Sequence, residues 1–224
     1  MRKLAFTFAL ILCFGLTSHA QQDPNAKRVL DAMKNKYESY SAFKISIVQD
    51  LLNSSDKVMN SIALKATVKK NKYIIELADQ IIYNNERTIW RYLPDEKEVT
   101  IHNNNSEEEG EDLFQSPSNL YKLYKDGFKY KMVASAKVGN TTCDVIELSP
   151  IDRDQFDFFK VKLFVSKTDK TLKQWTVFEK DQDTLEVARY RYKVTKFTPN
   201  IKVTDQNFSF NVPADVTIID MRDE

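Results

Sequence analysis

Few side chains in this sequence have the chemistry that enzymatic catalysis requires. The 224 residues include two histidines and two cysteines, and one of each lies within the first 20 residues. His102 adjoins an asparagine-rich stretch, so a Ser-His-Asp or Cys-His arrangement would have to be assembled around it alone. Cys143 lies among alternating apolar residues, a pattern typical of a small buried hydrophobic side chain rather than a nucleophile. We therefore do not expect an enzyme.

The same inventory gives no metal or cofactor site. One histidine, one cysteine and scattered carboxylates lack the clustered spacing of metal ligands, and no glycine-rich phosphate loop is present. The acidic stretch at residues 107–112 has the charge to bind calcium weakly, but a solvated loop is the better interpretation of such a run. The sequence predicts neither a metal nor a cofactor.

What the chain offers instead is apolar surface with the periodicity of β-strands. Residues 158–197 contain three segments in which apolar and charged residues alternate, which predicts three neighbouring antiparallel strands. Such a sheet cannot stand alone, because its apolar face must be covered by another layer or by closure of the sheet on itself. The residues that we place on the apolar face are Phe159, Val161, Leu163, Val165, Leu172, Trp175, Val177, Phe178, Ala188, Tyr190, Tyr192 and Val194.

The N-terminus predicts export. Arg2 and Lys3 precede an apolar run at residues 4–16, and a small-residue site ends at Ala20, as in a secretory signal peptide. A run of about 13 apolar residues is too short to span a bilayer. Leu12 precedes Cys13 where a lipid-attachment signal needs a small residue, so we expect a soluble exported protein. We predict a signal peptide at residues 1–20 and a single domain at residues 21–224.

The charge of the exported chain is close to neutral. Removing Arg2 and Lys3 leaves 33 − 2 = 31 basic side chains against 32 acidic ones. Nucleic acids and anionic membrane surfaces both require a basic excess on one face, so neither is expected as the main partner. Cys143 is then the single cysteine, and no intramolecular disulfide can form.

The remaining elements follow the same reasoning. Asp23 and Pro24 predict the start of an amphipathic helix of about four turns. Strand periodicity then begins at Phe43 and recurs to the end of the chain, which predicts about ten to twelve strands with two or three helices. Because glycine is rare, we expect the turns to use Asn, Asp and Lys.

One segment interrupts the strands. Residues 102–112 are polar and acidic and predict a mobile loop. A short amphipathic helix is predicted after it, beginning at Ser116 and ending before Gly127. Its position between a loop and a glycine favours a lid. The apolar side of this predicted lid consists of Leu120, Leu123 and Tyr124.

Periodicity alone leaves the purpose of the apolar face open. A curved sheet of this size has a concave face that its own side chains do not fill unless something plugs it. Ordinary packed core and a cavity for an apolar ligand both fit the alternation.

Three stretches carry a resemblance that favours the cavity. They are residues 68–73 (VKKNKY), 84–94 (NNERTIWRYLP) and 208–222 (FSFNVPADVTIIDMR). In order and spacing, together with the signal peptide and first helix, they resemble the LolA-like outer-membrane lipoprotein carrier family of the periplasm.

The resemblance implies a fold and a function. The fold is mainly β with a few helices, an incomplete, unclosed antiparallel β-barrel of about eleven strands whose helices form a plug and lid over a hydrophobic cavity. The implied function is a periplasmic carrier that takes acylated lipoproteins from an inner-membrane lipoprotein-releasing transporter to an outer-membrane acceptor. A carrier of another lipid, an envelope regulator and a structural barrel of the same fold remain alternatives, and we expect a monomer.

The resemblance also suggests site residues. Lys70 occupies the position where an arginine that binds the lid is typical, and a lysine can still donate hydrogen bonds to helix carbonyls. The residues predicted to line the lipid-binding cavity are Ile75, Trp90, Tyr92, Phe164, Trp175, Val177, Tyr190 and Tyr192.

Overall fold

The structure, a computed structural model, describes residues 22–104, 124–125, 127–154, 156–180 and 187–222. The predicted signal peptide therefore lies outside the described residues. The described part contains one α-helix, one 3-10 helix and twelve strands. Their bounds are α1 Pro24–Glu38, β1 Phe43–Leu52, β2 Val58–Lys69, β3 Lys72–Glu76, β4 Ile81–Asn84, β5 Thr88–Leu93, β6 Glu98–Asn103, β7 Phe128–Val138, β8 Thr141–Pro150, β9 Phe158–Ser166, β10 Leu172–Lys180, β11 Val187–Pro199, η2 Asp205–Phe208 and β12 Thr217–Asp220.

Helix α1 forms as the sequence predicts. Asp23 is its N-cap and accepts hydrogen bonds from the backbone N–H groups of Asn25 and Ala26 at 2.8 and 3.4 Å. The same carboxylate accepts the backbone N–H of Met132 at 2.8 Å, which ties the start of the helix to β7. The buried stripe of the helix consists of Ala26, Leu30, Met33 and Tyr37. Within the described part of the chain, no helix has the length and apolar character of a membrane span.

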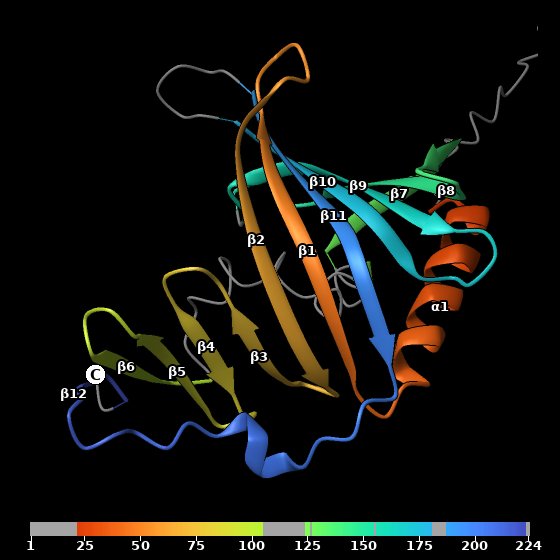
Figure 1. Cartoon of the computed structure of the whole chain (residues 1–224). Coiled ribbons are helices and arrows are strands. Elements are labelled where there is room, and N and C mark those ends of the chain that lie inside the picture. The colour runs from red at the N-terminus through yellow and green to blue at the C-terminus, as the bar shows by residue number, and fades with distance from the viewer. Residues whose placement is uncertain (1–21, 105–123, 126, 155, 181–186, 223–224) are drawn as a thin grey trace, which may run out of the picture.

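The twelve strands form one sheet in the order β12-β6-β5-β4-β3-β2-β1-β11-β10-β9-β8-β7. Every neighbouring pair is antiparallel except β12 and β6, which run parallel. Strands β12 and β7 are the two edges, and no ladder joins them among the described residues. The sheet curves strongly, and α1 runs alongside its β7–β11 half (Figure 1). The predicted unclosed antiparallel barrel is therefore confirmed.

The concave face of the sheet and α1 share one core. On β9 this face consists of Val161, Leu163 and Val165, as the alternation predicts. The prediction for Phe159 is wrong, because Phe158 is the buried residue. The ladder between β9 and β10 is irregular at this point, so a local shift reverses the alternation. The prediction for Phe178 is wrong as well, since it lies on the convex face under the Lys160 ammonium, 4.2 Å from the ring centroid.

The turns confirm that residues other than glycine supply positive φ angles. Lys70 and Asn71 form the whole connection between β2 and β3, and Lys70 has a φ of 57°. Among the described residues, three of the six non-glycine residues with positive φ are lysines. The six residues are Asp56, Lys70, Glu86, Lys97, Lys170 and Asn200.

The convex face holds its three central strands together with a charged cluster. Asp50 of β1 is 4% exposed and accepts a 2.6 Å hydrogen bond from the Ser61 hydroxyl of β2. Arg191 and Lys193 of β11 place nitrogens 2.8 and 3.2 Å from the other carboxylate oxygen. Burial alone would raise the pKa of Asp50, but the hydrogen bonds from Ser61, Arg191 and Lys193 lower it overall.

Replacing Asp50 by Asn should lower the free energy of unfolding by about 2 kcal/mol, because two cations lose their shared partner in a buried setting. The control Asp56→Asn breaks an exposed pair with Arg189 and should change this free energy by less than about 0.5 kcal/mol. Chemical denaturation measures both values. If both substitutions lowered the free energy of unfolding equally, the burial of Asp50 would not explain its contribution to stability.

The lowered pKa also predicts the pH dependence. The contribution of Asp50 to stability is present above the pKa of an unfolded carboxyl, about 4, and is lost as the pH falls through the folded-state value. The Asp50→Asn variant should therefore lose less stability on acidification than the wild-type protein does, as measured by denaturation at a series of pH values.

Candidate functional site

Five of the predicted cavity residues lie together on the concave face. They are Ile75, Trp175, Val177, Tyr190 and Tyr192. Trp175 and Tyr192 stack with ring centroids 4.9 Å apart and planes 5° apart. Val177 is directly opposite Tyr190 in the ladder between β10 and β11. The centre of the concave face is therefore an aromatic surface.

Polar groups are placed within this apolar surface. The indole Nε1–H of Trp175 is buried and has no hydrogen-bond partner among the described residues. Burial raises the pKa of Tyr192, and the charge of Glu179 raises it further. Burial likewise raises the pKa of Glu179, which follows Trp175 and Val177 on the same face of β10. An unpaired buried donor is costly, and a ligand carbonyl oxygen would satisfy it.

The other three predicted cavity residues lie on the opposite face. Phe164 alternates with Leu163 and Val165, whose side chains are in the core cluster, and is itself only half-buried. Trp90 and Tyr92 share a face of β5. Their β4 partners are Tyr83 and Ile81, whereas the core residue of β4 is Ile82. The structure thus does not bring Phe164, Trp90 and Tyr92 together with the other five.

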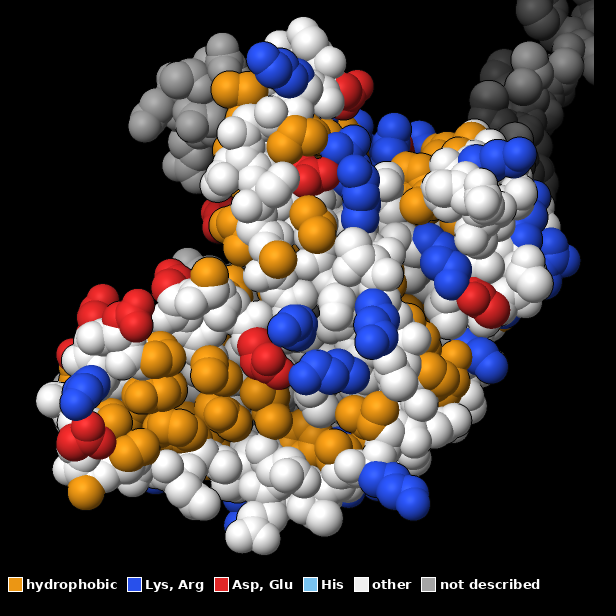
Figure 2. Space-filling model, in the orientation of Figure 1, with side chains coloured by type: hydrophobic (Ala, Val, Ile, Leu, Met, Phe, Trp, Pro, Cys, Tyr) orange, Lys and Arg blue, Asp and Glu red, His pale blue; other side chains and the backbone are white. Residues whose placement is uncertain are grey.

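The C-terminal segment explains why β5 turns its aromatic residues outward. Phe210 packs on Tyr83 and Tyr92, with ring centroids 5.0 and 4.8 Å away. On the same face of β6, Val99 and Ile101 are buried. Hydrophobic side chains gather over β3–β6 and along this segment in Figure 2. The convex side of this half of the sheet therefore has a second apolar layer.

Of the three residues on the predicted apolar side of the lid, the structure describes one. Leu120 and Leu123 lie outside the described residues, whereas Tyr124 is buried in the core cluster. Its hydroxyl donates a 2.8 Å hydrogen bond to the Asp31 carboxylate of α1. Burial, followed by this hydrogen bond, raises the pKa of Tyr124. The hydroxyl thereby fixes residue 124 to the helix.

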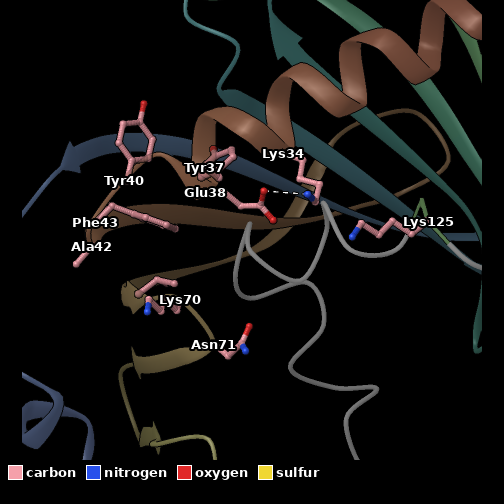
Figure 3. Close-up of a pocket in the computed structure, with 10 residues that line it drawn as sticks. Lys34, Tyr37, Glu38, Tyr40, Ala42, Phe43, Lys70, Asn71 and Lys125 are labelled. Atoms are coloured by element: carbon pink, nitrogen blue, oxygen red, sulfur yellow. Dashed lines mark hydrogen bonds and ion pairs between the residues drawn. The ribbon is translucent and has the colours of Figure 1, made fainter.

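A cavity of about 350 Å³ opens beside the end of α1 (Figure 3). Its volume is within the range of small-molecule sites. Three of its residues, Tyr37, Phe43 and Val68, belong to the core cluster, so the cavity is continuous with the concave face. The full lining is Lys34, Tyr37, Glu38, Tyr40, Ala42, Phe43, Val68, Lys70, Asn71 and Lys125.

Sequence reasoning found only Lys70 of this lining. The helical stripe predicted that Tyr37 would be buried, but not that it would border a cavity. One sequence signal for the charged lining of the cavity was available, because lysines are grouped at residues 34–36 and 69–72, near both ends of the cavity wall. The described residues contain no cluster of three or more His, Cys, Asp or Glu side chains that could hold a metal ion.

Sequence comparison places the chain in a family. A family model described as "Outer membrane lipoprotein carrier protein LolA" matches residues 39–211. Because this match spans well over half of the sequence, the chain belongs to the LolA outer membrane lipoprotein carrier protein family. The resemblance seen in the sequence is confirmed. No curated protein matches the chain in the sequence search.

Of three solved structures to which the chain is similar, the first supports this fold. An uncharacterized conserved protein from Thermus thermophilus superposes with a TM-score of 0.58 at 10% identity, covering 88% of this chain and 99% of that chain. A LolA superfamily protein from Nitrosomonas europaea gives 0.44 at 12% identity, covering 83% and 97% of the two chains. Lipoprotein LppX from Mycobacterium tuberculosis gives 0.46 at 12% identity, covering 81% and 98%.

The contact between Tyr124 and α1 can be tested by removing one hydroxyl. Tyr124→Phe should lower the free energy of unfolding by about 1.5 kcal/mol, because Asp31 loses a charge-assisted partner. Tyr130→Phe is the matched control, since Tyr130 is also buried but its hydroxyl makes no hydrogen bond to another described residue. Thermal and chemical denaturation should show little change for this control. Similar losses of stability in Tyr124→Phe and Tyr130→Phe would contradict a stabilising role of the hydrogen bond between Tyr124 and Asp31.

Proposed function

We propose that this protein is a carrier in the periplasm that binds the acyl chains of lipoproteins on its concave face. The observation that carries the proposal is the apolar cavity of about 350 Å³ that adjoins the concave face of an unclosed sheet. An open sheet edge permits the concave face to widen around a chain, which a closed barrel would resist. Membership of the lipoprotein carrier family supports the same function.

Energetics sets a requirement on such a carrier. A 16-carbon chain removed from water gains on the order of 13 kcal/mol, at about 0.8 kcal/mol for each methylene. A shuttle that kept all of this energy would not release its cargo. Helix α1 covers part of the concave face with its own apolar stripe. Displacing such intramolecular contacts offsets part of the gain and allows transfer to an acceptor.

The proposed route follows the family. The cargo is an acylated lipoprotein received from an inner-membrane releasing transporter and delivered to an outer-membrane acceptor. Residues 1–20 have the features of a signal peptide that would place the protein in the periplasm. Within this proposal Ile75, Trp175, Val177, Tyr190 and Tyr192 contact the acyl chain. The protein acts by binding and release, without a chemical transformation.

Native mass spectrometry tests the cargo. Protein purified from its own cell envelope should carry a lipoprotein whose mass includes acyl groups. A free lipid bound instead would make the protein a carrier of that lipid. A co-purifying partner protein without acyl groups would support an envelope regulator, and protein that stays empty under all conditions would support a structural barrel.

Substitution on the two faces of the sheet tests the site. Tyr190→Glu places a charge on the concave face and should abolish binding of the neutral apolar dye Nile red, because the charge resists desolvation by an apolar ligand. Phe164→Glu introduces the same charge at a half-buried aromatic residue of the opposite face and should leave dye binding intact. Circular dichroism checks that both variants fold. Equal dye binding by the two variants would overturn the assignment of the concave face.

A further inference from the structure

The cavity at the end of α1 has a charged rim. Lys34, Lys70 and Lys125 line it together with a single carboxylate, Glu38. Glu38 forms an ion pair with Lys34 at 2.8 Å. No described carboxylate lies within ion-pair distance of Lys70 or Lys125. The rim therefore has two positive charges that no described carboxylate compensates.

The turn between β2 and β3 directs one of its lysines to this rim. Lys69 and Lys72 both bind the Asp205 carboxylate of η2, at 2.7 and 3.0 Å. These two hydrogen bonds lower the pKa of Asp205 to about 2. Between them Lys70 adopts a φ of 57° and lines the cavity with Asn71. The turn thus pairs two of its lysines with Asp205 and leaves the third beside the opening.

The floor of the cavity is apolar. Tyr37 and Phe43 meet there with ring centroids 5.5 Å apart, and Val68 is 1% exposed. In Figure 3 Lys34 and Lys125 extend toward the space beside Glu38, while Lys70 and Asn71 border it from the β2–β3 turn. Apolar walls with cations at the mouth match an amphiphile whose chain is buried and whose head group is anionic.

We propose that this cavity binds the head of an acylated ligand that carries a negative charge, a carboxylate or a phosphate, through Lys70 and Lys125. The inference rests on the proposed function, in which the chain lies on the concave face. An anion at the mouth is attracted by both ammonium groups and leaves the chain on the aromatic side. A neutral head group of the same size gains no Coulomb attraction there. The cavity therefore selects anionic over neutral amphiphiles.

Competition with Nile red tests this selectivity. Decanoate, decyl phosphate and 1-decanol share a ten-carbon chain and differ in the head group, and each is titrated against the dye bound to the full protein. The anionic competitors should displace Nile red at a concentration about tenfold lower than 1-decanol does. In the double variant Lys70→Gln/Lys125→Gln this difference should disappear, while displacement by 1-decanol is unchanged. Whether decanoate or decyl phosphate competes better identifies the head group.

The control removes the same charge from the convex face. Lys65→Gln/Lys196→Gln changes two exposed lysines that flank Ser46 in the ladders of β1, and it should retain the preference for anions. Equal competition by decanoate and 1-decanol in the wild-type protein, or a preference that survives in Lys70→Gln/Lys125→Gln, would overturn the inference but leave acyl-chain binding intact. Failure of Nile red and of all three competitors to bind would overturn the proposed function as well.

Discussion

An antiparallel sheet that is apolar on one face must bury that face, and the structure depends on how this burial is achieved without closing the sheet. Alternation along each strand commits every second side chain to the concave face. Strands β7 and β12 remain unpaired with each other among the described residues, so curvature and α1 must provide the cover. Asp23 fixes the start of α1 to β7 through the backbone N–H of Met132, which places the helical stripe over the β7–β11 half. The apolar residues whose burial stabilises the fold thus also form the proposed binding surface.

The two faces of the sheet are stabilised by different interactions. On the central strands the convex face is polar, and Asp50 joins β1, β2 and β11 through Ser61, Arg191 and Lys193. On β4–β6 the convex face is apolar instead, and Phe210 covers it from the C-terminal segment. Among the described residues, the apolar concave face continues into the cavity at the end of α1. This division explains why a carrier of this fold can offer one face to a ligand while the other maintains the sheet.

Charge at the cavity mouth and apolar surface inside it serve complementary purposes. In the proposed function, the aromatic surface around Trp175 and Tyr192 provides affinity for an alkyl chain without regard to its head group. We propose that lysines at the rim add selectivity, because a cation distinguishes an anionic head group from a neutral one. Asp205 contributes indirectly by pairing with Lys69 and Lys72, so that Lys70 alone of the three lines the cavity from that turn. Family membership supports the proposed carrier function, whereas the proposed selectivity depends on these individual residues.

Local sequence patterns were enough to predict the elements and much of the core. The N-cap at Asp23, the stripe of α1, the antiparallel strands and the inward tyrosines of β11 all follow from periodicity and capping. The faces used by the aromatic residues of β5 and by the phenylalanines of β9 depend instead on tertiary contacts. Side chains alternate with a period of two, so a shift of one residue exchanges the faces, and no local pattern reports such a shift. Trp90 and Tyr92 turn outward because Phe210, far along the chain, returns to cover that side. The cavity likewise joins a helix end, a turn and Lys125, and their proximity is a property of the folded chain alone.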